Sequence, residues 1–214
     1  MKLVLHNYWR SSASHRVRIG LGLKQLAYDY VAVNIVLGDQ QRDAYRARNP
    51  LAQVPTLEIT EDDGTRLVLT QSLPILEYLD ERWPAPPILP RDPYARARAL
   101  AEIINAGIQP MQNLLTTRRI KAFGVDDAAW VRPFIAEGLA AFARSAADTM
   151  GAFCVGDSPT IADCCLVPQL GAARRYQVEL DECCQPLFAI EARCLALPAF
   201  AGAKPEQQPD AVTS

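Results

Sequence analysis

Three serines, Ser11, Ser12 and Ser14, connect an apparent strand to an apparent helix within residues 8–24. Serine is a favoured residue at a helix N-terminus, where the first backbone N–H groups have no partner in the helix and the helix dipole is positive. An anion or a thiolate is stabilised at such a position. The segment therefore predicts a binding turn for an anion or thiolate, and a plain helix cap is the competing interpretation.

Composition restricts the class of protein that can carry this turn. The chain has 214 residues, half of them apolar, which is enough for one large domain or two small ones. Its 22 basic and 24 acidic side chains nearly cancel and form no long run, so nucleic acid is not an expected partner. No stretch of about 18 uninterrupted apolar residues is present, so no membrane span is expected.

All six cysteines lie in the second half of the chain and include two adjacent pairs. This spacing does not resemble a secreted disulfide framework, and both histidines, His6 and His15, are far away in sequence. We therefore expect buried free thiols, no metal site and a cytoplasmic protein. The cysteines are Cys154, Cys164, Cys165, Cys183, Cys184 and Cys194.

Apolar periodicity in the first part of the chain predicts a βαβ unit followed by a ββα unit, which is the thioredoxin-like order. The expected strands cover residues 3–8, 28–35, 54–59 and 66–69, and the expected helices cover 12–25, a short segment through Tyr45, and 71–82. Five prolines between residues 84 and 93 then exclude a helix or a central strand.

Beyond these prolines the spacing is helical at about 93–121, 126–149, 160–174 and 186–197, with no convincing strand. The predicted organisation is an α/β domain over residues 1–83, a proline-rich linker over 84–92 and an all-α domain over 93–214. The polar stretch 204–210 is expected to be an extended tail on the surface.

The order of these parts resembles the cytosolic glutathione transferase fold, and the Ser-Ser-x-Ser-x-Arg-Val-Arg signature at 11–18 looks like the zeta class, which includes maleylacetoacetate isomerase. Ala13 occupies the position where the family usually has a cysteine, so the thiol of the motif is absent. Matches run along nearly the whole chain: Asn49-Pro50, Gln53-Val54-Pro55, Gln71-Ser72, Gly107-Ile108-Gln109-Pro110, Gln112-Asn113-Leu114, Val155-Gly156-Asp157, Ala162-Asp163, Leu166-Val167-Pro168-Gln169 and Gln208-Pro209-Asp210.

The resemblance implies glutathione as cofactor, with Ser11 facing its sulfur and Ser12 and the following N–H groups completing the pocket. Lowering a thiol pKa by about two units requires roughly 2.7 kcal/mol of thiolate stabilisation. A helix N-terminus provides up to about 2 kcal/mol, and a hydroxyl hydrogen bond to a charged acceptor about 1.5 to 3 kcal/mol. Together they suffice without a cysteine at position 13.

Further positions match the family's glutathione-binding residues. Val54-Pro55 fits the family's cis-proline, where the backbone of Val54 would pair with the cysteinyl part of the ligand as an added strand. Gln71 and Ser72 open a helix, where a capping hydroxyl and unpaired N–H groups suit the carboxylate of the γ-glutamyl end. The remaining matches, for which ordinary surface amides are the alternative, are Gln40, Gln109 and Asn113.

A diacid substrate requires fixed cations, and arginine binds carboxylates bidentately. We assign this role to Arg10, which precedes the serines, and to Arg175, which matches a family position, whereas Arg174 is expected to be solvated. His15 is expected to be partly exposed and structural.

Arg16 and Arg18 are expected to form structural or interface ion pairs. The Thr-x-x-Asp sequence at Thr160–Asp163 is expected to be a capping box in the helical core.

The chemistry implied is addition of the glutathione thiolate to the cis double bond of maleylacetoacetate, rotation in the resulting enolate, and expulsion of the thiolate to leave fumarylacetoacetate. Maleylpyruvate is an alternative substrate, as are small α-halo acids in a transferase or dehalogenase reaction. A non-catalytic glutathione-binding protein is the alternative from another class, and Ala13 is the feature in its favour. The resemblance also implies a homodimer.

Overall fold

The computed structural model describes residues 1–90 and 94–212. The chain forms two compact units, one of residues 1–86 with residues 198–212, and the other of residues 87–197. The predicted boundaries place everything after residue 93 in one helical domain, whereas the structure groups the C-terminal residues with the first unit. Residues 91–93, which include the end of the predicted linker, lie outside the described residues.

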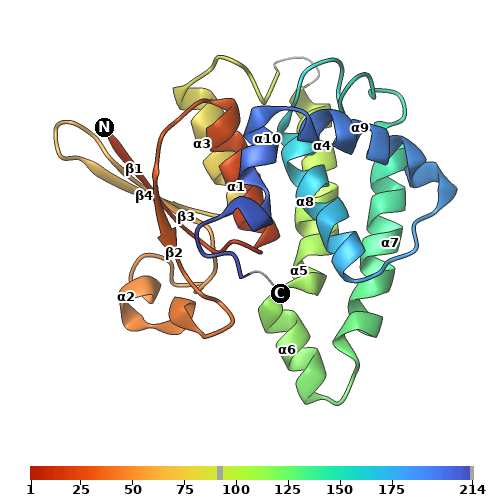
Figure 1. Cartoon of the computed structure of the whole chain (residues 1–214), viewed down its shortest axis with the longest axis horizontal. Coiled ribbons are helices and arrows are strands. Elements are labelled where there is room, and N and C mark those ends of the chain that lie inside the picture. Colours follow the sequence, from red (N-terminus) through yellow and green to blue (C-terminus); the bar gives the residue numbers. More distant parts are fainter. Residues whose placement is uncertain (91–93, 213–214) are drawn as a thin grey trace. The chain divides into compact units, whose positions relative to one another are not determined.

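A four-stranded sheet in the order β2-β1-β3-β4 forms the centre of the first unit (Figure 1). β1 pairs with β2 in parallel and with β3 antiparallel, and β3 pairs with β4 antiparallel. This confirms the predicted βαβ-ββα order, although the second strand is shorter than expected. The elements are β1 (Lys2–Asn7), α1 (Ser12–Leu23), β2 (Asp29–Ala32), η1 (Asp39–Gln41), α2 (Asp43–Arg46), β3 (Thr56–Thr60), β4 (Arg66–Thr70) and α3 (Ser72–Arg82).

The core of this unit lies between the sheet and helices α1 and α3. Strand side chains alternate between two faces, and Leu57 and Ile59 of β3 are almost completely buried. Gly20 of α1 lies against Leu76 of α3, and a Cβ atom on Gly20 would lie 2.1 Å from the Leu76 side chain. The glycine therefore lets the two helices approach closely on the sheet.

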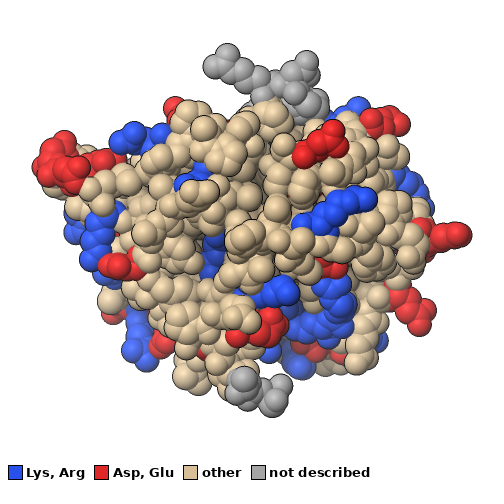
Figure 2. Space-filling view, turned by 45° about the horizontal axis from the view of Figure 1, so that its top comes forward, with Lys and Arg blue, Asp and Glu red and all other residues tan. Residues whose placement is uncertain are grey.

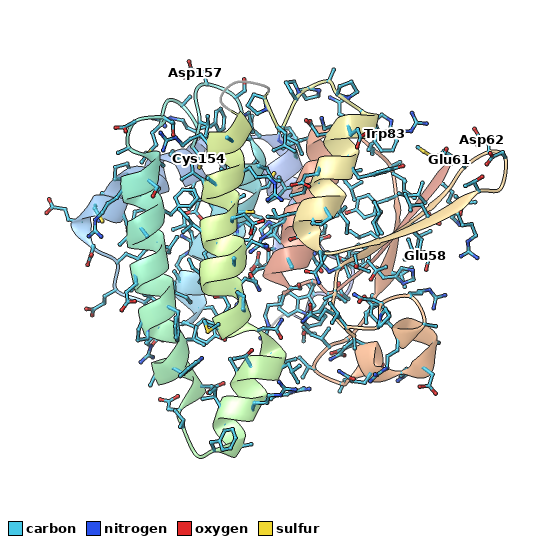
Figure 3. All side chains as sticks on the ribbon, turned by 180° about the vertical axis from the view of Figure 1, so that it is seen from behind. Glu58, Glu61, Asp62, Trp83, Cys154 and Asp157 are labelled. Atoms are coloured by element: carbon cyan, nitrogen blue, oxygen red, sulfur yellow. The ribbon has the colours of Figure 1, made fainter. Side chains whose placement is uncertain are left out.

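Glu58 points to the opposite face of β3, on the side of α2 (Figure 3). Its carboxylate accepts from Arg48 Nε at 2.5 Å and Arg66 Nη2 at 3.1 Å, and lies 2.9 Å from His6 Nε2. These cations hold the pKa of the Glu58 carboxyl below its usual range, against the effect of desolvation. The ion pairs connect β1, β3, β4 and the end of α2.

The second unit is helical, in agreement with the sequence pattern, but the first predicted helix is divided. A π-helical turn over Ile103–Ile108 and a break at Asn113 interrupt it. Pro110 follows just after the π-helical turn and has no backbone N–H to continue the helical ladder there. The segments are α4 (Tyr94–Glu102), η2 (Ile103–Ile108), α5 (Gln109–Gln112), α6 (Leu114–Ala122), α7 (Asp127–Ala146), α8 (Ile161–Arg175), η3 (Glu182–Cys184) and α9 (Gln185–Leu195).

Helix α8 is the most buried helix of this unit, with contacts to α4, α7 and α9. Its N-terminus has the predicted capping box: Thr160 Oγ1 accepts from Ala162 N–H at 3.3 Å, and the Asp163 carboxylate accepts from Thr160 N–H at 2.7 Å. Asp163 also accepts from Cys154 N–H at 2.9 Å. The box therefore ties the loop before α8 to the helix.

The C-terminal residues are not an extended tail. They form α10 (Pro198–Ala203) and the short helix η4 (Pro205–Gln207), and α10 packs against α1. Gly22 of α1 permits this contact, because a Cβ atom there would lie 3.1 Å from the Ala199 backbone. The prediction of a surface tail is wrong because the polar side chains of this segment bind partners in the first unit.

Acidic and basic side chains are interspersed over the face shown in Figure 2, and the acidic turn between β3 and β4 forms a red group at its left edge. The turn contains Glu61, Asp62 and Asp63. Among the described helices, none has the length and apolar character required to cross a bilayer.

Candidate active site

The strand register brings four predicted binding segments to one end of the sheet. The carboxyl end of β1 pairs with the amino end of β3 at His6 and Thr56, and Thr56 also pairs with Thr70 at the end of β4. β2 runs parallel to β1 and ends beside Asn7. The loops after β1 and β2, the segment before β3 and the start of α3 therefore lie at this end.

Ser11 is the N-cap of α1. Its Oγ accepts from Ser14 N–H at 3.2 Å, and its own N–H donates to Tyr8 O at 3.0 Å. A hydroxyl that accepts in this way still has a hydrogen to donate. The structure thus combines the helix cap and a remaining donor in one half-buried residue at the positive end of α1.

Ser12 and Ser14 are both buried, and Ala13 between them is half-buried. Ser14 Oγ lies 3.5 Å from Tyr8 N–H, which ties the first turn of α1 to the loop before it. Ser12 is the first helical residue, where a backbone N–H has no acceptor within the helix. The two serines therefore differ in surroundings: Ser14 holds the loop, and Ser12 lies at the predicted sulfur site.

Val54-Pro55 is a cis peptide bond, as the sequence predicts. Two side chains, one in α2 and one in the loop after it, hold the carbonyl group of the residue before Val54. Gln53 O accepts from Tyr45 Oη at 2.6 Å and from Asn49 Nδ2 at 2.8 Å. Burial raises the pKa of the Tyr45 hydroxyl. This network sets the backbone that precedes β3.

At the start of α3, neither Gln71 nor Ser72 caps the helix with its side chain, in contrast to the expected capping hydroxyl. Gln71 is the N-cap of α3, with a positive φ of 70° and no side-chain cap hydrogen bond, and its Nε2 donates to Gln53 Oε1 at 3.4 Å. Ser72 is not the capping hydroxyl, because its buried Oγ accepts from Arg16 Nη1 at 3.1 Å. A strained backbone at a non-glycine residue is typical of a functional position.

Gln40 is buried, and its Nε2 donates to Ile35 O at 3.2 Å. Its Oε1 is also buried and has no hydrogen-bond partner among the described residues. An unsatisfied buried acceptor is unfavourable in a folded protein. Binding of glutathione by Gln40 therefore remains a prediction, because this oxygen is shielded from solvent.

The predicted substrate cations have different surroundings. Arg10 is exposed, with its guanidinium 5.7 Å from the centre of the Trp9 ring, and Arg175 is exposed at the end of α8, 5.5 Å from the Tyr176 ring. Arg174 is ion-paired, not merely solvated, since its guanidinium binds both oxygens of the buried Glu191. Binding of a substrate carboxylate by Arg10 or Arg175 remains a prediction.

Gln109 and Asn113 lie at the break in the first helical segment. Asn113 is the N-cap of α6, where its Oδ1 accepts from Leu115 N–H at 2.9 Å, and Gln109 Oε1 accepts from Gln112 Nε2 at 3.2 Å. Asn113 thus has a structural role in this unit. Binding of glutathione by either amide remains a prediction.

Comparison with known protein families identifies the first unit. The family model described as "Glutathione S-transferase, N-terminal domain" matches residues 10–82. The chain is 45% identical to a maleylacetoacetate isomerase of Rhizobium meliloti, covering 95% of this chain and 96% of that protein. It is 44% identical to a maleylpyruvate isomerase of a Ralstonia species, covering 96% and 98%.

Crystal structures of the maleylacetoacetate isomerase from Anaeromyxobacter dehalogenans 2CP-1 are similar over the whole fold. They superpose with a TM-score of 0.90 at 48% identity, covering 99% of this chain and 98% of that one. One holds glutathione in its active site, and another holds dicarboxyethyl glutathione and citrate. A maleylpyruvate isomerase structure described as a bacterial zeta-class glutathione S-transferase is also similar, with a TM-score of 0.90 at 39% identity, covering 98% of this chain and 100% of that one. This chain belongs to the zeta class of glutathione transferases.

The buried face of α1 in this zeta-class transferase differs from the expectation in three residues. His15 is 6% exposed, not partly exposed, and burial beside Arg18 lowers its pKa to about 3. Arg16 is buried against Ser72. The buried guanidinium of Arg18 donates mainly to backbone carbonyls, with Trp9 O at 2.9 Å. Helix α1 packs against both α3 and α10, so its polar side chains are buried as well as its apolar ones. The high density of Ser, His and Arg in this helix was the sequence feature that could have indicated this burial.

The cysteines of this transferase are free, and five of the six are buried, whereas Cys183 is half-buried. Burial raises the pKa of the Cys154 thiol, which lies inside the helical unit (Figure 3). A buried thiol with a raised pKa is a poor nucleophile. Within the described residues, no group of His, Cys, Asp or Glu side chains has the arrangement of a metal site.

Proposed function

We propose that this zeta-class transferase is a glutathione-dependent isomerase that converts maleylacetoacetate to fumarylacetoacetate, with maleylpyruvate as the alternative substrate. The observation that carries the proposal is the Ser11 hydroxyl at the N-terminus of α1, which caps the helix and keeps a hydrogen to donate. The names of the Rhizobium and Anaeromyxobacter relatives support the first substrate, and that of the Ralstonia relative supports the second.

The residues at this end of the sheet fit glutathione. Ser11 and Ser12 would face its sulfur, the Val54 backbone its cysteinyl part, and Gln71 and Ser72 its γ-glutamyl end. The unsatisfied Oε1 of Gln40 provides a buried acceptor for a ligand N–H group. When bound, glutathione supplies a thiolate that adds to the cis double bond and leaves again, so it is regenerated.

The protein stabilises negative charge at two places. The donor hydrogen of Ser11 and the positive end of α1 favour the deprotonated sulfur. Arg10 and Arg175 are the predicted partners of the substrate carboxylates, and a cation fixed at a carboxylate also stabilises the charge that develops on the substrate. Ala13 adds no thiol of its own, so the nucleophile belongs to the cofactor.

The first experiment follows the loss of maleylacetoacetate and of maleylpyruvate by absorbance, each with and without glutathione. We expect turnover that requires glutathione, and the substrate with the higher kcat/KM is the preferred one. If neither substrate isomerises while glutathione binds, the proposal is wrong. Reaction with a small α-halo acid then distinguishes a transferase or dehalogenase from a non-catalytic binding protein.

Two neighbouring arginines of α8 provide a matched test of substrate binding. The Arg175→Ala substitution removes the proposed carboxylate contact, which is worth about 1.5 to 3 kcal/mol, so KM for the diacid should rise roughly 10- to 150-fold. Arg174→Ala should leave KM unchanged and lower stability, because the buried Glu191 carboxylate loses its partner. Equal KM values for both variants would contradict the assignment of Arg175.

We also infer a homodimer and a cytoplasmic location. Membership of the zeta class supports the dimer, and the five buried free cysteines fit a reducing compartment.

A further inference from the structure

The C-terminal segment of residues 204–212 returns to the loop that carries Ser11. Gln208 is buried, and its Nε2 donates to Gly202 O at 2.9 Å and to Lys204 O at 2.8 Å. These bonds fold the segment back after α10, and α10 itself packs on α1. The Gln-Pro-Asp sequence of the zeta-class resemblance thus lies beside the active-site loop of the same unit.

Asp210 binds this loop directly. Its Oδ2 accepts from Trp9 N–H at 3.2 Å, and its Oδ1 accepts from the hydroxyl of Tyr30 in β2. Trp9 belongs to the turn that ends at Ser11, where Tyr8 O accepts from Ser11 N–H at 3.0 Å. A carboxylate that accepts from a backbone N–H makes a charge-assisted hydrogen bond, which is stronger than one between neutral groups.

Arg18 binds the carbonyl oxygens of the same turn. Its Nη2 donates to Trp9 O at 2.9 Å, and its Nη1 lies 3.4 Å from Tyr8 O. Its Nε donates to Ala203 O at 3.1 Å, which connects the turn to the end of α10. The N–H and the C=O of Trp9 are therefore both fixed, one by Asp210 and the other by Arg18.

We propose that Asp210 is a positioning residue for the isomerase reaction: by holding Trp9, it sets the backbone from which the Ser11 hydroxyl faces the sulfur of glutathione. This inference rests on the proposed function. Ser11 lies two residues beyond Trp9, so a released turn changes the direction of its hydroxyl. Catalytic groups displaced by about 1 Å can lose a factor of about 100 in rate.

The test compares Asp210→Ala with Asp210→Asn and with Glu206→Ala, a change at an exposed residue of the same segment. We expect D210A to lower kcat roughly 10- to 100-fold, with KM for glutathione unchanged within about threefold. D210N should recover part of the loss, because its amide oxygen still accepts from Trp9 N–H. E206A should match the unchanged protein.

A second measurement separates positioning from stability. The pKa of enzyme-bound glutathione, from thiolate absorbance against pH, should rise in D210A and D210N, whereas a purely structural role would lower only the unfolding midpoint. An unchanged bound-thiol pKa together with kcat within twofold of the original would overturn the inference. If D210A does not fold, the Asp210→Leu variant, which is similar in size and has no oxygen to accept from Trp9 N–H, decides by the same two criteria.

The thiol pKa also keeps this inference separate from the proposed function. If the unchanged protein isomerises neither diacid, the proposed function fails. The comparison of bound-thiol pKa values between the unchanged protein and D210N still tests whether Asp210 sets the position of Ser11.

Discussion

At the scale of single residues, the proposed site contains hydroxyl and amide groups that use only part of their hydrogen-bonding capacity within the described residues. Ser11 accepts from Ser14 N–H and retains a donor, and Gln40 donates to Ile35 O while its Oε1 has no partner among the described residues. Each side chain is fixed by one contact and has a further hydrogen-bonding capacity that no described residue uses. Such preorganised groups cost no reorganisation when charge develops.

Substitution of Ser11 tests its hydroxyl. Both Ser11→Ala and Ser11→Gly remove the donor, and loss of a hydrogen bond to a charged acceptor should lower kcat/KM about 10- to 150-fold. The glycine variant also separates this role from capping, since glycine at an N-cap costs only a few tenths of a kcal/mol, against about 1 kcal/mol for alanine. The measurement is steady-state kinetics of both variants. If S11G keeps the original kcat/KM, Ser11 only caps α1.

Buried His15 predicts a dependence of stability on pH. Its pKa is about 3 in the folded protein and about 6.5 in the unfolded chain. Between these values the unfolded chain binds a proton that the folded chain does not, so the free energy of unfolding falls as pH falls from about 6.5 towards 3. One such group contributes roughly 1.4 kcal/mol per pH unit within this window.

The His15→Gln substitution should therefore flatten the decrease of stability between about pH 6 and pH 4 in urea unfolding. His6→Gln is the comparison, because burial lowers the pKa of His6 as well but Glu58 opposes the shift, so the slope should change less. An equal slope in H15Q and the unchanged protein would contradict the buried, neutral state of His15.

At the scale of elements, helix ends connect sequence to function in both units. The N-terminus of α1 holds Ser11 and Ser12, that of α3 follows the strained Gln71, and that of α8 has the capping box. The first two lie at one end of the sheet because the register of β1, β3 and β4 places them there. Helix ends of the same kind thus belong to the proposed site in one unit and stabilise the fold in the other.

The capping box of α8 predicts a large effect on stability. Asp163 is fully buried, and Asp163→Ala leaves the N–H groups of Cys154 and Thr160 without their acceptor, at about 1 to 3 kcal/mol each. Urea unfolding should show a loss of about 2 to 6 kcal/mol. Asp126→Ala, at the exposed N-cap of α7, is the control and should cost about 1 kcal/mol. Similar losses in both variants would show that burial of Asp163 has no special effect.

At the scale of the whole molecule, the first of the two units is not continuous in sequence, since residues 198–212 belong with residues 1–86. The C-terminal segment reaches α1 and the Trp9 turn through α10, Gln208 and Asp210. We expect a truncation after Leu197 to expose the buried side of α1 and to destabilise the first unit more than a substitution in the segment.

Assembly is tested by sedimentation equilibrium. The proposed homodimer should have twice the chain mass of 23.6 kDa at micromolar concentration. A mass of one chain that does not change with concentration would exclude it.

Local patterns in the sequence were sufficient for much of the fold and for part of the site. Strand alternation and helical periodicity predict the βαβ-ββα order, and serine chemistry predicts the cap at Ser11. The Thr160–Asp163 capping box follows from its spacing alone. These features depend on interactions between residues close in sequence, which is why the sequence alone determines them.

The tertiary structure decided which polar residues are buried together. Asp210 binds Trp9, 201 residues away, and Arg16 binds Ser72, 56 residues away. In sequence Asp210 belongs to a polar, proline-bearing stretch that is typical of a surface tail, and Arg16 belongs to a run of polar helix residues. No periodicity distinguishes a solvated charge from one that has a distant buried partner, because that difference arises only when the chain brings the two groups together.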